Sequence, residues 1–295
     1  MAAVIETHEL RKRYGAHEAV RGLSLSVSAG SICAFLGQNG AGKSSTIKML
    51  LGMVHPTAGS ARVLGLDIAD EKDSLRIRER VAFVAEDKRL YDYMTVEQII
   101  RFTKAFFPRW RADLEQRLLD EFELPLRRRV GQLSKGMRTK LALLLGFARG
   151  CELLILDEPT EGLDPVAIEE VLQNIVSLAA DGATIFFSSH QIAEVEQIAD
   201  HVLMIDHGTL VLDEPIDRMK EQYRQLEAVF SQPVTASAFQ LAGVEQVHAE
   251  GRSVSLLATR DVDAIVAEMR AMHAVSVDVL PITLKEIFLK KVGAR

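Results

Sequence analysis

A glycine-rich stretch at Gly37–Ser44 is the first segment of the chain whose residue types suggest chemistry. It reads Gly-Gln-Asn-Gly-Ala-Gly-Lys-Ser, which has the spacing G-x-x-x-x-G-K-[ST]. Such glycines let the backbone wrap around a phosphate chain, so that N–H groups and a helix N-terminus face the anion. Lys43 would then reach the β- and γ-phosphates, and Ser44 would offer its hydroxyl to Mg²⁺. The stretch predicts a phosphate-binding loop, with a chance glycine-rich turn as the alternative.

Two carboxylates, Asp157 and Glu158, directly follow the apolar run Leu153–Leu156. Carboxylates at the C-terminal end of a strand in an open α/β sheet lie where ligands bind. Asp157 would hold Mg²⁺, directly or through water. Glu158 would polarise the water that attacks the γ-phosphate, a general-base role worth about 10²–10⁴ in rate. The alternative is an acidic turn after a strand, and the phosphate-binding loop earlier in the chain disfavours it.

A histidine and a tyrosine are further candidates for the same site. His190 follows the expected strand Thr184–Phe187, which gives it the same kind of position as Glu158, although a lone histidine is more often structural. Tyr14 lies in a turn between two expected strands, Val4–Leu10 and Ala19–Val27. It is either a surface aromatic or a ring that stacks on a purine base, and its own position leaves both readings open.

The elements around these residues alternate between strands and helices. The loop is preceded by the apolar run Ser31–Leu36 and followed by helical spacing up to Leu51, and Val81–Val84 is a further expected strand. A helical segment intervenes before Glu152. Its expected helices begin at Thr95, which forms a capping pair with Gln98, at Ala112 and at Ser134. We therefore expect an α/β domain with a helical insert at about residues 87–150.

The pattern of expected strands and helices changes at residue 226, so we expect an ATPase-like domain at 1–222 and an accessory domain at 226–295. The expected order in the second domain is βαββαβ, which is typical of a ferredoxin-like α+β unit, followed by a last helix. The expected segments are Leu226–Phe230, Val234–Leu241, Val244–His248, Val254–Ala258, Val262–Met272, Val275–Leu280 and Thr283–Val292.

Composition narrows the class of protein. The 295 residues are 48% hydrophobic and carry a net charge of −6, so no basic field points to nucleic acid. Cys33 and Cys151 stand in apolar runs and are interpreted as buried thiols in a reducing compartment. The segment Met1–Leu10 lacks the apolar core of a signal peptide, and no apolar run approaches the roughly 18 residues that span a bilayer. At a membrane, another chain would supply the spans.

The ordered set of motifs resembles the nucleotide-binding subunit of an ABC transporter over residues 4 to about 214. By this resemblance Gly37–Ser44 is the Walker A motif, Asp157 ends Walker B and Glu158 is the catalytic glutamate. Leu133–Met137 falls on the signature motif, Asp164 on the D-loop and His190 on the switch histidine. A core P-loop NTPase sheet, an antiparallel β subdomain and a helical subdomain are implied. The implied nucleotide-binding residues are Tyr14 (the A-loop aromatic), Gly37, Asn39, Gly40, Ala41, Gly42, Lys43, Ser44, Ser45, Ser134 and Gly136.

Two departures from the family pattern bear on function. The signature keeps Ser134 and Gly136 but has Lys135 for glycine and Met137 for glutamine, so its anion site at a helix N-terminus is retained. Glu86 stands where the Q-loop glutamine is usual, and its carboxylate could join Ser44 and Asp157 in holding Mg²⁺. Glutamate at this position looks like a variant of ABC-2-type exporter ATPases, which often carry a C-terminal extension. This favours export over import.

The resemblance implies an ATPase whose two copies, as a homodimer or heterodimer, sandwich two ATP molecules with Mg²⁺. Closure of the dimer would drive separate transmembrane permease subunits, to which the chain would be bound at the cytoplasmic face of the membrane. One alternative is a soluble mechanochemical ABC ATPase acting on ribosomes or DNA. The single P-loop and the short stretch between residues 45 and 133 disfavour it. A nucleotide sensor without turnover is disfavoured by the presence of both Glu158 and His190.

Overall fold

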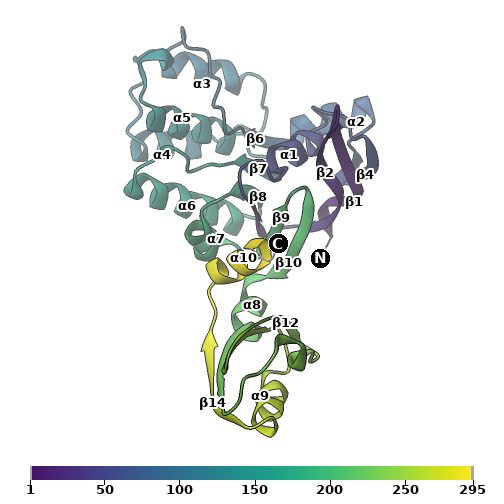
Figure 1. Cartoon of the computed structure of the whole chain (residues 1–295). Coiled ribbons are helices and arrows are strands. Elements are labelled where there is room, and N and C mark those ends of the chain that lie inside the picture. Colours follow the sequence, from purple (N-terminus) through teal and green to yellow (C-terminus); the bar gives the residue numbers. More distant parts are fainter. Residues whose placement is uncertain (1, 294–295) are drawn as a thin grey trace. The chain divides into compact units, whose positions relative to one another are not determined.

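The computed structural model describes residues 2–293 and divides into two compact units, with the boundary between Asp213 and Glu214 (Figure 1). The first unit contains two sheets and the second contains one, and each unit has its own apolar core. Helix α8 (Ile216–Gln222) is grouped with the second unit.

The first unit is built on a six-stranded sheet with the order β10-β9-β3-β8-β7-β6. Strand β3 is parallel to β8 and β9, and β7 is parallel to β8 and β6. Every residue of β3, β7 and β8 is buried, as the continuous apolar runs predict for strands covered on both faces. The parallel strands end at one edge of the sheet, which brings the segments after β3, β7 and β8 together. The strands are β3 (Ile32–Leu36), β6 (Val81–Val84), β7 (Leu153–Asp157), β8 (Thr184–Ser189), β9 (His201–Asp206) and β10 (Thr209–Pro215).

An antiparallel sheet with the order β2-β1-β4-β5 lies beside this core in the first unit. Its strands are β1 (Ala3–Tyr14), β2 (His17–Ser28), β4 (Ala58–Val63) and β5 (Leu66–Asp67). Strands β1 and β2 form a long hairpin that ends with Tyr14 opposite His17. Apolar residues of both sheets, including Leu23 and Phe35, share one core cluster. That shared packing fixes the hairpin end against the central sheet.

The helices that begin at the carboxyl edge of the central sheet have defined starts. Helix α1 (Lys43–Leu50) begins after Gly42, whose φ is 109°, and α6 (Pro165–Ala180) is capped by Asp164, which accepts from two backbone N–H groups. Helix α7 (Ile192–Ile198) follows β8. Asp70 caps α2 (Glu71–Arg80), a helix that the sequence analysis did not predict.

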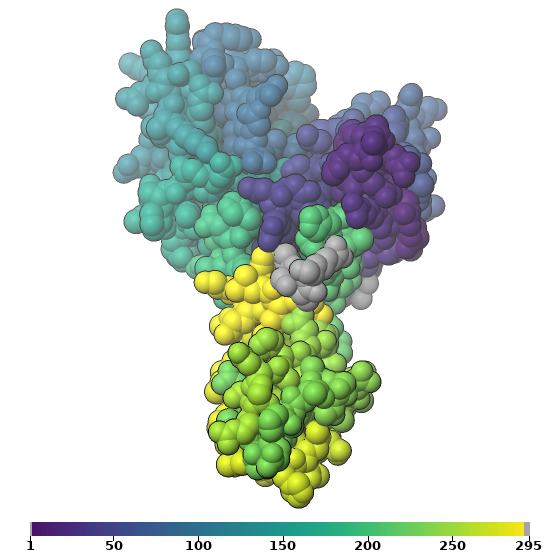
Figure 2. Space-filling model, viewed as in Figure 1, coloured from purple at the N-terminus to yellow at the C-terminus, as the bar shows by residue number. Residues whose placement is uncertain are grey.

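The helical insert lies between β6 and β7 and forms its own lobe of the first unit in the space-filling view, coloured blue to teal (Figure 2). The predicted capping box is confirmed, because Thr95 and Gln98 exchange hydrogen bonds at the start of α3. Ser134 caps α5 through its hydroxyl, as expected for a helix that begins at the signature motif. The elements are α3 (Val96–Lys104), α4 (Ala112–Glu121), the short 3₁₀ helix η1 (Val130–Gln132) and α5 (Lys135–Phe147).

The second unit contains a four-stranded antiparallel sheet with the order β12-β13-β11-β14. Its core includes Phe230 and Phe239, whose ring centroids lie 5.5 Å apart. The helix expected at 234–241 is only a 3₁₀ turn, η2 (Ala236–Phe239). The ferredoxin-like assignment stays a prediction. The remaining elements are β11 (Arg224–Phe230), β12 (Val244–Glu250), β13 (Ser253–Ala258), α9 (Val262–Ala271), β14 (Ala274–Pro281) and α10 (Leu284–Gly293).

Strand β4 begins at Ala58, which pairs with Arg11 of β1. Gly59 has a φ of +79°, and a Cβ there would lie 2.2 Å from the carbonyl oxygen of Glu9. The glycine therefore permits close strand pairing at this point. Among the described residues no helix combines the length and the apolar character needed to cross a membrane.

Candidate functional site

A cavity of about 340 Å³ lies at the carboxyl edge of the central sheet and gathers most of the predicted site residues. The glycine-rich loop follows β3, Glu86 follows β6, and Asp157 and Glu158 come at the end of β7. Tyr14 joins them from the end of the β1–β2 hairpin. The volume is in the range of small-molecule sites. The lining residues are Tyr14, His17, Ala19, Gln38, Asn39, Gly40, Gly42, Lys43, Ser44, Ser45, Glu86, Asp157 and Glu158.

The glycine-rich loop is shaped by close backbone approaches. A Cβ at Gly37 would lie 2.6 Å from the carbonyl oxygen of Ile205, and a Cβ at Gly42 would lie 2.5 Å from that of Ala19. Gly40 has a φ of +82° with nothing within 4 Å of its Cβ position, so this part of the loop is open. The Lys43 ammonium donates to the Gly37 carbonyl at 2.7 Å. The loop thus presents backbone N–H groups and one ammonium at a helix N-terminus, as an anion site requires.

The Glu158 carboxylate lies between two nitrogen-bearing side chains. Its Oε2 is 2.9 Å from His190 Nδ1, and its Oε1 is 3.3 Å from Lys43 Nζ, an ion-pair distance without hydrogen-bond geometry. The Glu158 side chain is 6% exposed and that of His190 is 44% exposed. The backbone of Glu158 is left-handed, with a φ of +48°, a strain of about 1–3 kcal/mol that tends to occur at functional sites. A buried carboxylate held in this way can accept a proton from a water beside the loop.

Ser188 links the two carboxylate residues, and the sequence analysis did not single it out. Its hydroxyl donates to Asp157 Oδ1 at 2.5 Å and accepts the Glu158 backbone N–H at 3.1 Å. Ser188 is fully buried and pairs with Asp157 in the parallel β7–β8 register. The signal that could have found it is a polar residue at the end of an otherwise apolar strand.

Lys88 is the second residue that the sequence analysis missed. It lies in the loop after β6, and its ammonium donates to the backbone carbonyl of Glu158 at 3.0 Å. Burial lowers the pKa of Lys88, although the nearby Glu161 carboxylate opposes this shift. Lys88 and Glu158 are 70 residues apart in the sequence, so no local sequence pattern predicts their contact.

Tyr14 and Glu86 both stand at the mouth of the cavity. The Tyr14 side chain is 46% exposed, and the Lys12 ammonium lies 5.1 Å from its ring centroid. An exposed ring at the cavity margin is available for stacking on a base. Glu86 is exposed and shares the cavity lining with Ser44 and Asp157. These three residues provide hydroxyl and carboxylate oxygens, which are the ligands that Mg²⁺ prefers.

The signature and D-loop residues do not line this cavity. Ser134 and Asp164 cap α5 and α6, and the pKa of Asp164 is lowered because its carboxylate accepts hydrogen bonds from backbone N–H groups of Ala167 and Val166. Gly136 lies beside the D-loop, because a Cβ there would be 3.4 Å from the Gly162 carbonyl oxygen. Lys135 reaches across to Glu161 with a 2.6 Å ion pair. The two motifs are thus joined to each other and separate from the cavity.

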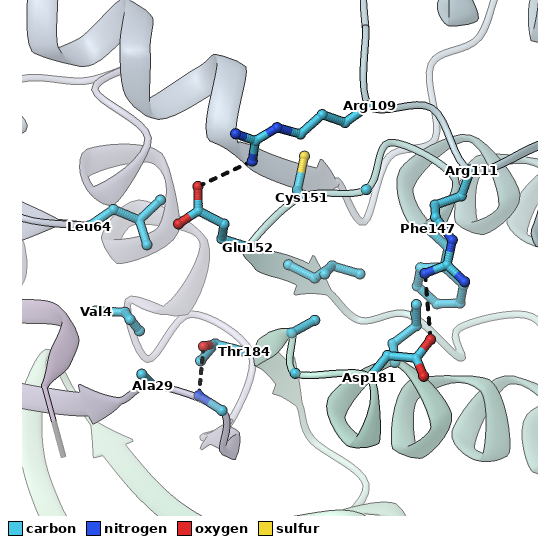
Figure 3. Close-up of a pocket in the computed structure, with 16 residues that line it drawn as sticks. Val4, Ala29, Leu64, Arg109, Arg111, Phe147, Cys151, Glu152, Asp181 and Thr184 are labelled. Atoms are coloured by element: carbon cyan, nitrogen blue, oxygen red, sulfur yellow. Dashed lines mark hydrogen bonds and ion pairs between the residues drawn. The ribbon is translucent and has the colours of Figure 1, made fainter.

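A larger cavity of about 510 Å³ lies at the opposite end of the strands (Figure 3). Glu152 and Thr184, which line it, stand at the amino ends of β7 and β8. Arg109 pairs with Glu152 at 3.7 Å and Arg111 with Asp181 at 3.5 Å, so these charges satisfy one another. None of the predicted site residues lines this cavity. The candidate site is therefore the cavity of about 340 Å³ at the carboxyl edge of the central sheet.

Comparison with known proteins agrees with this geometry. A family model described as "ABC transporter" matches residues 20–161. The bacitracin transport ATP-binding protein BcrA of Bacillus licheniformis is 36% identical over 228 residues, which are 76% of this chain and 74% of that protein. The Nod factor export ATP-binding protein I of Ralstonia nicotianae is 32% identical over 98% of this chain and 94% of that protein. A solved structure of the ATP-binding subunit of an ABC transporter superposes with a TM-score of 0.67 at 31% identity, covering 74% of this chain and 92% of that chain.

Proposed function

Because the chain belongs to the ATP-binding subunits of ABC transporters and is an ATPase, we propose that it powers export through separate transmembrane subunits. The membership confirms the family that the ordered motifs predicted. The observation that carries the proposal is the cavity where the phosphate-binding loop meets Asp157 and Glu158, with His190 on the Glu158 carboxylate. A relative named for Nod factor export supports the export direction.

Different residues of the cavity serve different parts of ATP binding and hydrolysis. The loop N–H groups and Lys43 bind the phosphates, and the exposed Tyr14 ring stacks on the adenine. Ser44, Asp157 and Glu86 would hold Mg²⁺, which would neutralise charge on the phosphate oxygens. One buried atom supports the fit of this cavity to a bound nucleotide and its attacking water. Glu158 Oε1 has no hydrogen-bond partner among the described residues, as expected of an atom that contacts a ligand.

Within this site the chain's own residues handle the proton. Glu158 accepts it from the attacking water, because its carboxylate is buried beside the loop and not engaged in a full hydrogen bond at Oε1. His190 Nδ1 holds the other oxygen and so orients the carboxylate. Ser188 keeps Asp157 and Glu158 in fixed relative positions. Positioning and electrostatics of this kind supply most of the catalysis in phosphoryl transfer.

A second ATPase subunit completes the site. Ser134, Gly136 and Asp164 lie outside the cavity of their own subunit, although the family resemblance assigns them to nucleotide handling. They are exposed or half-buried and lie at or near the starts of two helices, where N–H groups can address a phosphate. We infer that each subunit presents them to the nucleotide of its partner, in a homodimer or heterodimer.

A groove beside the helical insert is the proposed docking site for the permease. It has a volume of about 330 Å³ and is formed by the loop after β6 and by α3 and α5. Four aromatic rings continue from it across the surface: Tyr93, Tyr91, Phe102 and Phe106, whose successive centroids lie 5.8, 5.8 and 5.2 Å apart. All four are exposed, by 42% or more. Contiguous exposed aromatic residues favour a protein interface over a solvent face.

The charge in this groove specifies the chemistry of the docking segment. Arg149 lies over the Phe107 ring at 4.3 Å, and its Nε has no hydrogen-bond partner among the described residues. No carboxylate lies within ion-pair distance of it in the described part of the chain, and burial lowers its pKa. A half-buried guanidinium whose Nε lacks a hydrogen bond and which has no carboxylate beside it favours an acidic ligand, so we expect the permease segment to bring an Asp or Glu beside apolar residues. Docking of this kind would hold the chain at the cytoplasmic face of the membrane.

Affinity purification from native membranes tests this function. The tagged chain should retain a multi-spanning membrane protein that raises its ATPase rate, and Phe102→Ser or Arg149→Glu should lower the retained amount at least tenfold. Leu75→Ser, at an exposed apolar site on α2, is the control and should retain it fully. Recovery of ribosomes or DNA in place of a membrane protein would support the soluble mechanochemical alternative and overturn the proposal.

We propose that residues 226–295, which lie within the second unit, form an accessory domain, and that residues 1–222 form an ATPase domain whose helical subdomain spans about 87–150. None of the residues that line the cavity comes from the second unit. Its separate core supports independent folding. We infer a role in dimerisation or regulation.

A further inference from the structure

The loop between β6 and α3 touches both the catalytic glutamate and the proposed docking groove. Lys88 donates from its ammonium to the carbonyl oxygen of Glu158 at 3.0 Å. Lys88 also lines the groove together with its neighbours Arg89, Leu90 and Tyr91. A short stretch of chain therefore connects the surface offered to a partner with the backbone of the catalytic residue.

The Lys88 contact is made to a backbone group and not to a carboxylate. No Asp or Glu of the described residues lies within ion-pair distance of its ammonium, although Glu161, Glu86 and Asp157 act on it from farther away. Lys88 is half-buried. Lys88 therefore bonds a carbonyl group although three carboxylates act on it electrostatically. We attribute this choice of partner to the geometry of its loop.

The bonded carbonyl belongs to a residue whose backbone must be held in place. Glu158 has a φ of +48°, which residues other than glycine rarely adopt. Its N–H is held by Ser188, and its carbonyl is held by the N–H of Glu161 at 3.3 Å and by Lys88. Because the two peptide groups decide where the Cα–Cβ bond points, they also decide whether the carboxylate meets His190 and Lys43.

We propose that Lys88 is a positioning residue for Glu158, because its ammonium fixes the Glu158 carbonyl and with it the direction of the catalytic carboxylate. A displacement of about 1 Å in a catalytic group can change a rate about 10²-fold. This role does not depend on the proposed permease function, because the contact lies within one chain.

Steady-state ATPase kinetics of the full chain test the positioning role. Lys88→Met keeps the aliphatic stem and removes the donor, so we expect kcat to fall about 10–100-fold with the KM for ATP within about twofold of wild type. Lys88→Arg keeps a donor and should recover most of the rate. Lys140→Met, which removes a half-buried lysine that pairs with Glu170 and does not line the cavity, controls for general destabilisation and should leave kcat unchanged.

A combination with Glu158→Gln separates positioning from damage. If Lys88 acts through the Glu158 carboxylate, adding Lys88→Met to Glu158→Gln should not lower the residual rate further, because residues that act as a unit are not additive. A further tenfold loss in the double variant would overturn the proposal, as would a Lys88→Met kcat within twofold of wild type. If Lys88→Met lowers basal turnover while native membranes fail to stimulate the wild-type chain, the positioning role stands and the permease function fails.

Discussion

Replacing Ser188 by alanine removes one hydroxyl that serves both acidic residues of the site. The Ser188 Oγ donates to Asp157 Oδ1 at 2.5 Å and accepts from the Glu158 N–H at 3.1 Å, in a fully buried position. In Ser188→Ala the Glu158 N–H keeps its bond to the Ser188 carbonyl at 3.3 Å, but Asp157 loses a donor. The change therefore acts mainly on the carboxylate proposed to hold Mg²⁺.

Two magnitudes follow from this geometry. Leaving a buried acceptor without its partner costs about 1–3 kcal/mol, so the free energy of unfolding of the first unit should fall by that amount. Loss of a hydrogen bond to a metal-binding group typically costs about 10–100-fold in metal affinity or activity. We expect the free Mg²⁺ concentration for half-maximal ATPase activity to rise by that factor.

The assay is a titration of ATPase activity against free Mg²⁺ for wild type, Ser188→Ala and Ser189→Ala. Ser189 is equally buried, but its hydroxyl bonds Glu194 and the Gln191 N–H and touches neither acidic residue of the site. Its alanine variant should therefore follow the wild-type curve. A folded Ser188→Ala protein whose half-saturation lies within twofold of wild type would refute the reasoning.

Three further predictions use other parts of the chain. Glu86→Gln should preserve activity at saturating Mg²⁺ and weaken its Mg²⁺ dependence, whereas Glu86→Ala should slow turnover; three superimposable titration curves would show that Glu86 is only a surface charge. A chain ending near Tyr223 should still bind Mg-ATP but change in dimerisation or regulation, and a folded truncation without ATP binding would contradict an accessory second unit. Burial raises the pKa of Glu194, so its contribution to stability is complete below its ordinary pKa of about 4.5 and is lost as pH rises through the folded-state value. The melting temperature of Glu194→Gln should therefore increase relative to that of wild type as pH rises. A difference in melting temperature that does not change with pH would contradict this.

The parts of the fold that the sequence predicted are those set by local pattern. The continuous apolar run of β7 is typical of a strand buried on both faces, and the residues that follow it are brought to the sheet edge by parallel pairing. The caps at Thr95, Ser134 and Asp164 depend on residues three positions apart or fewer. Motif spacing therefore located most of the cavity residues, and capping located helix starts, without tertiary information.

The parts that the sequence did not predict depend on contacts between distant segments. Ser188 meets Glu158 across 30 residues through strand register, and Lys88 meets it across 70 residues through the path of a loop. Helix α2 was missed because only Ser74 and Ile77 of its ten residues are buried, which leaves no apolar stripe to recognise. Side-chain positions of this kind follow from packing and not from composition.

The measurement that tests the account most directly is ATP turnover by Glu158→Gln. The carboxylate is buried, oriented by His190 and aimed at the phosphate-binding loop, so it is the general base of the proposed mechanism. We expect hydrolysis to fall by about 10²-fold or more, with ATP binding retained and an ATP-bound dimer accumulating in solution. Turnover within about threefold of wild type would contradict the assignment of Glu158, because a general base contributes far more than that.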